Sequence, residues 1–257
     1  MAQIMLECGL APMLVALATL VARRFGPRAG GMLSAFPAIV GPVLLVVALD
    51  HGRSFAAQAA DGTLLGLVAL SGFALAYGRA ALRWSWPTCL AAGWAAAGAT
   101  ATVGGVLTRG AGPTSSLAIA VLSLSVAYLA LPRPRPAPAL AVMTFGSLRM
   151  RMALTAVLVC ALSIAAGVLG PLVGGMLAAL PVLASVLSVF THREADPQVL
   201  LSFLRGMLIG MGGFVAFCEV VALAIVHQGT AFAFAAATAA AVVAQGAAVY
   251  WPAASRA

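Results

Sequence analysis

Apolar stretches of roughly 18 or more nearly uncharged residues recur along the whole chain, and each is long enough to cross a membrane as a helix. The 257 residues include only 14 Lys or Arg and 6 Asp or Glu, too few to coat a soluble domain. The stretches also lack the alternation that a membrane β-barrel requires. The sequence therefore predicts an all-α, polytopic bundle of transmembrane helices, with the lipid bilayer as its partner.

Nine spans are expected where apolar runs are bounded by charged residues, glycine or proline. Pro132 to Pro138 alternate proline with other residues, which excludes a helix and predicts an extended linker. Residues 139–150 are too few to span and are expected to form an interfacial segment. The nine spans are 4–22, 30–49, 55–77, 87–107, 115–131, 151–169, 174–191, 198–226 and 230–251.

The arginines predict how these spans are oriented. With the N-terminus outside, eleven arginines, Arg151 among them, fall in loops or the tail on the cytoplasmic side, against two on the other side. Such an asymmetry follows the positive-inside rule of helical membrane proteins. It also accounts for the net charge of +8 without a nucleic-acid partner. The expected topology is an outside N-terminus and a cytoplasmic C-terminus.

A repeat with an offset of 144 residues is the most informative pattern. Residues 26–37 (GPRAGGMLSAFP) and 170–181 (GPLVGGMLAALP) are identical at eight of twelve positions. The same offset aligns 61–66 (DGTLLG) with 205–210 (RGMLIG). Equivalent spans are five apart, an odd number, so the two copies would enter the membrane from opposite sides. The sequence predicts two inverted four-helix repeats, 1–110 and 139–257, joined by a connecting helix and linker at 111–138.

Inverted repeats of this kind are typical of secondary transporters, whose sites lie at paired helices interrupted by glycine and proline. The repeated motif supplies such a pair, with a kink expected at each of its two prolines. An alternative is that the glycines serve only close helix packing. On the transport interpretation, the candidate substrate-binding residues are Gly30, Gly31, Ser34, Pro37, Gly174, Gly175, Pro181 and Ser185.

Three ionisable residues lie within predicted spans and are candidates for ion coupling: Asp61, Glu219 and Arg205. Charged side chains inside a bilayer are costly, so they are functional hypotheses by default. Alternatively, Arg205 extends to the cytoplasmic surface and the two acids lie near the outer interface. Asp61, about two turns into its helix, is the preferred protonatable group.

The segment from Gly30 to Tyr77, with its GGMLSAFP motif, apolar run, Asp50-His51-Gly52 turn and second apolar helix, resembles GlpM-type small bacterial membrane proteins. The chain resembles two such four-helix units fused through an extra helix. The resemblance implies a location in the bacterial inner membrane and an association with exopolysaccharide production. It implies no catalytic residues.

No enzyme motif is present: the sequence lacks H-E-x-x-H, G-x-S-x-G and paired membrane-embedded aspartates. We therefore expect no catalytic residues, no metal and no cofactor, and we interpret the four cysteines as small packing residues. The function expected is a secondary carrier for a small, weakly polar or amphiphilic substrate. The alternative is a non-transporting accessory or assembly subunit of an envelope-polymer or lipid-handling system. A homodimer and a membrane partner subunit are both compatible with the sequence.

Overall fold

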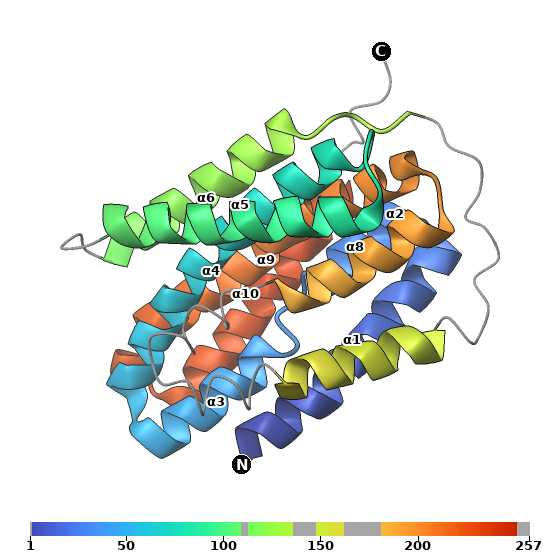
Figure 1. Ribbon diagram of the computed structural model, residues 1–257. Coiled ribbons are helices and arrows are strands. Elements are labelled where there is room, and N and C mark those ends of the chain that lie inside the picture. The colour runs from blue at the N-terminus through green and yellow to red at the C-terminus, as the bar shows by residue number, and fades with distance from the viewer. Residues whose placement is uncertain (1, 109–112, 136–147, 162–180, 251–257) are drawn as a thin grey trace.

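The computed structural model describes residues 2–108, 113–135, 148–161 and 181–250, and this part of the chain is entirely helical apart from its connections (Figure 1). A further helical segment, 148–161, lies between α6 and α8. The other helices are α1 (Ala2–Phe25), α2 (Pro27–Ser34), α3 (Val40–His51), α4 (Arg53–Ala80), α5 (Trp86–Leu107), α6 (Pro113–Ala130), α8 (Val182–Glu194), α9 (Pro197–Gln228) and α10 (Thr230–Tyr250).

Glycine and proline residues lie at several of the short connections between consecutive helices. Gly52 between α3 and α4, with φ 89°, adopts a left-handed conformation that other residues rarely accept. At the start of α9, the Asp196 carboxylate accepts a hydrogen bond from the Gln198 backbone N–H at 2.7 Å, and Pro197 occupies the first turn. Both residues suit a helix start, because the cap satisfies a free donor and proline has none to satisfy. The chain therefore reverses direction within one or two residues at each of these joints.

The predicted span 30–49 is not one continuous helix, which corrects the sequence-based expectation of a kink. Helix α2 ends at Ser34 and α3 begins at Val40. Pro37 lies in the gap, where it cannot donate a helical hydrogen bond. The turn tightens before it, since the backbone N–H of Phe36 donates to Leu33 O at 3.0 Å, three residues back. The result is two half-helices with a non-helical break at residues 35–39.

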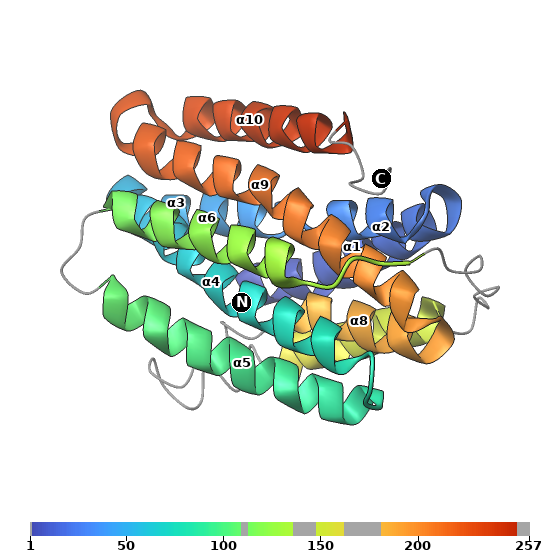
Figure 2. The ribbon, with the colours of Figure 1, turned by 90° about the horizontal axis from the view of Figure 1, so that it is seen from above.

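Two long helices, α4 and α9, form the centre of the bundle, and Figure 2 shows α5 and α10 at opposite edges. Most large buried side chains belong to the central pair, including Leu64, Phe73, Leu204 and Met207. The edge helices bury only a narrow stripe of small residues and expose large apolar ones such as Val243. An outer surface of this kind is suited to lipid rather than to water.

Four helices of the described chain are long and apolar enough to cross a membrane: α4, α5, α9 and Thr230–Ala248 of α10. Val40–His51 and Ser115–Ala130 are shorter apolar helices. Residues 148–150 of the predicted interfacial segment are helical and continue into 151–161, while 139–147 lie outside the described residues, as do 162–169 and 174–180 of two predicted spans. These helices indicate an integral membrane protein of the all-α class.

Candidate functional site

The glycines of the first repeated motif lie where α2 packs against α1 and α9. A Cβ atom on Gly30 would collide with Ala22, and one on Gly31 would collide with the carbonyl of Phe203. On the facing helix, a Cβ on Gly206 would meet the Arg28 backbone in the same way. These glycines allow two backbones to approach without side chains between them. Gly174 and Gly175, their counterparts, lie outside the described residues.

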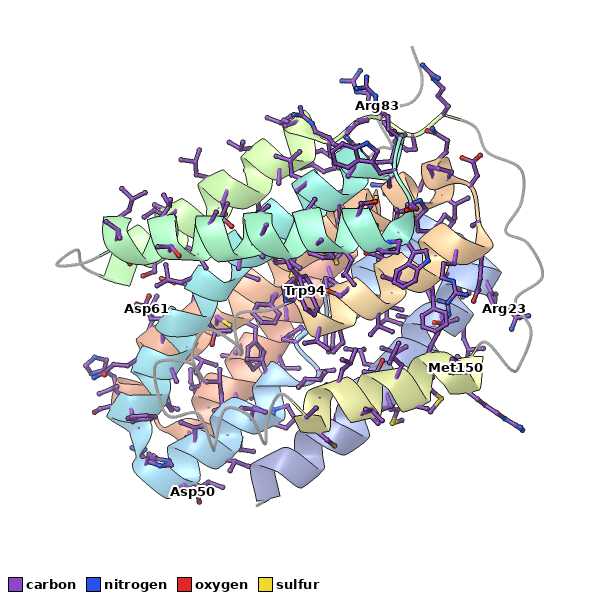
Figure 3. All side chains as sticks on the ribbon, in the orientation of Figure 1. Arg23, Asp50, Asp61, Arg83, Trp94 and Met150 are labelled. Carbon is purple, nitrogen blue, oxygen red and sulfur yellow. The ribbon has the colours of Figure 1, made fainter. Side chains whose placement is uncertain are left out.

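The two serines of the candidate site lie on different parts of the bundle. The Ser34 hydroxyl donates to Gly31 O at 2.7 Å, so it is bound to its own helix. Ser185, in the first turn of α8, donates to Pro181 O at 2.8 Å and accepts from Trp94 Nε1 at 2.8 Å. Figure 3 shows Trp94 in the middle of the molecule, between α5 and α8. A short hydrogen-bonded chain therefore joins α5 to the first turn of α8 inside the bundle.

Among the three ion-coupling candidates, Asp61 lies in α4 and Glu219 in α9, the two central helices. The Ser116 hydroxyl of α6 donates to Asp61 Oδ2 at 3.2 Å. Arg205 lies apart from this pair. It donates to Tyr128 O at 3.2 Å and Leu131 O at 2.8 Å, which satisfies carbonyls at the C-terminal end of α6.

A buried ion pair that the sequence did not predict lies between segment 148–161 and α8. Arg151 Nη2 donates to Glu194 Oε2 at 2.7 Å, with the Arg151 side chain 1% exposed and that of Glu194 24% exposed. The guanidinium carbon also lies 5.0 Å from the centre of the Phe190 ring. Arg151 therefore lies within a helical segment rather than in a loop, and its side chain is enclosed by neighbouring helices.

Beside Arg151 is a small cavity of about 10 Å³ between α1, the start of α2, α8, α9 and segment 148–161. Thr19, Thr191 and Arg151 supply its polar lining, and Ala18, Leu187 and Phe203 are among its apolar walls. Within the described chain, Thr19 Oγ1 and Arg151 Nε have no hydrogen-bond partner although both are buried. Unsatisfied buried polar atoms are rare, and here two of them belong to one cavity lining.

A second polar contact lies at the same, C-terminal end of α8. The Tyr77 hydroxyl lies 3.4 Å from His192 Nδ1, and the two rings meet edge to face. Burial lowers the pKa of the His192 imidazole below its usual value, because the charged form loses hydration. Burial therefore favours the neutral form of the His192 imidazole.

Sequence reasoning missed Arg151, Glu194 and Thr19 because each resembles an ordinary boundary or packing residue. Arg151 begins a predicted apolar span, where an arginine usually marks a loop. One signal was available: the offset of 144 pairs Arg151 with Glu7 and Glu194 with Asp50, so only one copy has a cation there.

The cysteines of the described chain differ in their chemical state. Cys89 and Cys218 are buried free thiols. Cys160 is disulfide-bonded, so the interpretation of this cysteine as a small packing residue is wrong.

The fold and the enclosed polar groups define a class, an α-helical integral membrane protein with ionisable side chains inside its bundle. Residues 4–91 match a family described as a protein of unknown function, DUF3147. The match runs from α1 to the start of α5 and does not extend over residues 92–257. No curated protein and no solved structure shows a significant match, so no named homologue supports the resemblance to GlpM-type proteins.

Proposed function

We propose that this protein is a small secondary carrier of the bacterial inner membrane, built from two inverted repeats. The observation that carries the proposal is the agreement of helix starts with the sequence repeat. Helix α4 begins at Arg53 and α9 at Pro197, while α5 begins at Trp86 and α10 at Thr230, each pair 144 residues apart. Figures 1 and 2 show α4 running opposite to α9, and α5 opposite to α10. Antiparallel equivalents are what inversion requires.

The buried positions support the same equivalence. The stripe on α5 contains Cys89, Gly93 and Ala97, and the stripe on α10 contains their counterparts at the same offset, Ala233, Ala237 and Ala241. In the central helices, nine of the twelve buried positions of α4 are also buried in α9. These nine are Ala56, Ala60, Leu64, Leu67, Ala69, Ser71, Phe73, Ala74 and Tyr77. Two copies of one packing scheme account for this agreement.

The charge distribution supports an outside N-terminus. In Figure 3, Arg23 and Arg83 lie toward one end of the bundle, whereas Asp50 and Asp61 lie toward the other. The arginine-rich end would face the cytoplasm under the positive-inside rule. The joint between α3 and α4 would then face outside.

Alternating access would use the break between α2 and α3 and the start of α8. Helix α3 begins after the break that contains Pro37, and α8 begins directly after Pro181. Broken helices of this kind form substrate sites in transporters, because their free backbone groups face a protected interior. Few charges line these segments, so a small weakly polar or amphiphilic substrate fits them best.

Thiol labelling from each side of the membrane tests the proposal. Cysteines introduced by Ser34→Cys and Ser185→Cys, in a variant without its native cysteines, should react slowly with an impermeant maleimide in both right-side-out and inverted vesicles. The reason is that each site opens to one side at a time. Exposed Ser54→Cys and Ser85→Cys are controls expected to react from outside only and from inside only. Labelling of both test positions from a single side in every condition would contradict a carrier.

Proton coupling is assigned to Asp61, because it is an acid within a long apolar helix and its Oδ2 accepts a hydrogen bond from Ser116 of the neighbouring α6. In proteoliposomes loaded with a pH-sensitive dye, compounds that drive proton movement through the wild type should fail to do so through Asp61→Asn. The matched control is Asp50→Asn, which removes an exposed acid at the end of α3. Unchanged proton movement in Asp61→Asn would remove this residue from the mechanism.

A further inference from the structure

The Arg151 guanidinium has more hydrogen-bond donors than its protein surroundings use. Its terminal Nη2 engages Glu194, but within the described chain Nε has no partner, and the side chain is 1% exposed. A buried arginine is costly unless its hydrogen bonds are complete. An arginine that served only to hold α8 in place would be better satisfied. The incomplete set of partners therefore points to a missing acceptor.

The missing acceptor has a place to bind. The cavity of about 10 Å³ beside Arg151 holds about one oxygen-sized group in this conformation, and the unpartnered hydroxyl of Thr19 belongs to the same lining. Its other walls include Ala18 and Leu187 from α1 and α8. In this conformation the cavity therefore has room for one oxygen atom of a ligand between Arg151 and Thr19, and the rest of the ligand would need the space that Glu194 occupies.

Glu194 is the more solvent-accessible partner of the ion pair. It is the last residue of α8, where the negative end of the helix dipole disfavours an acid. With 24% of its side chain exposed, it can turn toward solvent, whereas Arg151 is enclosed. A carboxylate from a ligand can therefore take the position that the Glu194 carboxylate occupies here.

Building on the carrier proposal, we propose that Arg151 binds the carboxylate head group of a monoanionic amphiphile, which displaces Glu194. A guanidinium binds a carboxylate through two parallel hydrogen bonds, which would employ Nε together with a terminal nitrogen. Arg151 is the one cation among the described cavity-lining residues, which matches a single negative charge. The equivalent positions of the other repeat are the acidic Glu7 and Asp50, so the head-group site belongs to one side of the membrane.

Ligand-induced stabilisation tests this site in purified protein held in nanodiscs of uncharged lipid. The probe is octanoate, with octanol as the uncharged match and acetate as the match without a chain. In Glu194→Ala, octanoate replaces the missing counter-ion and should raise the Tm by about 5 °C at a hundredfold excess over its Kd. Wild type should show a smaller shift, because Glu194 competes. The double variant Arg151→Met/Glu194→Ala should show none.

Two comparisons, one between variants and one between ligands, test whether octanoate binds at this cavity. Thr19→Val should weaken octanoate binding about fivefold through loss of one hydrogen bond, whereas Thr238→Val, on α10 with its hydroxyl bound to its own helix, should have no effect. An octanoate shift that persists in the double variant, or one matched by octanol, would overturn the head-group site. Equal shifts from acetate and octanoate would overturn the assignment to an amphiphile.

The carrier and the head-group site can fail separately. Octanoate binding that depends on Arg151, combined with thiol labelling from one side only, keeps the head-group site and overturns transport. Labelling from both sides, without an Arg151-dependent octanoate shift, keeps transport and overturns this substrate class.

Discussion

Gly206→Ala is expected to destabilise the protein by about 1–3 kcal/mol, whereas Gly62→Ala at the equivalent repeat position stabilises it by up to about 1 kcal/mol. Alanine is ordinarily the better helix former, so both changes would stabilise an isolated helix. At Gly206, however, the added methyl group meets the backbone of Arg28 in α2, which cannot rotate away as a side chain could. At Gly62 no atom lies within 4 Å of the new Cβ.

The measurement is the unfolding free energy of both variants in the same detergent, by chemical or thermal denaturation. Because each variant changes only one hydrogen to a methyl group, differences in hydrophobicity cancel. Gly31→Ala, which meets Phe203 O from the opposite side of the same interface, should repeat the loss. Equal effects at Gly62 and Gly206 would mean that α2 and α9 are not packed backbone to backbone.

Many of the helices could be predicted from the sequence, because an apolar run and the glycine, proline or charged residues at its ends determine where a helix forms. The start of α9 at Pro197 follows from a capping aspartate and a proline, both visible in the sequence. The full break between α2 and α3 could not be predicted. A proline at position 37 is compatible with either a kink or a break, and the packing of neighbouring helices decides between them.

The candidate site could also be predicted from the sequence only in part. The repeated motif identified glycines whose positions matter, yet Gly30 and Gly31 lie against α1 and α9 rather than beside Ser185. Arg205 is an ionisable group within a span, but its Nη1 donates to carbonyls at the end of α6. Partners separated by 40 or more residues, such as Arg151 and Glu194, leave no local pattern. They become visible only when the helices are assembled.

The Arg151–Glu194 pair leads to an asymmetric prediction, in which removing the acid costs more than removing the base. Glu194→Ala leaves a charge on an enclosed side chain that is 1% exposed, and we expect a loss of about 3–5 kcal/mol. Arg151→Met leaves Glu194, which can turn to solvent, while the methionine packs against Leu187 and Phe203. Its cost should therefore be markedly smaller.

The double variant Arg151→Met/Glu194→Ala is the informative control. With both charges gone, neither desolvation nor an unpaired ion remains, so the unfolding free energy should return to within about 1 kcal/mol of the wild type. The three variants and the wild type form a double-mutant cycle whose coupling energy measures the pair directly. Additive effects, or a larger loss for Arg151→Met than for Glu194→Ala, would contradict an enclosed arginine. Near-recovery of stability in the double variant would mean that folding does not require this ion pair, which is consistent with keeping it for a ligand.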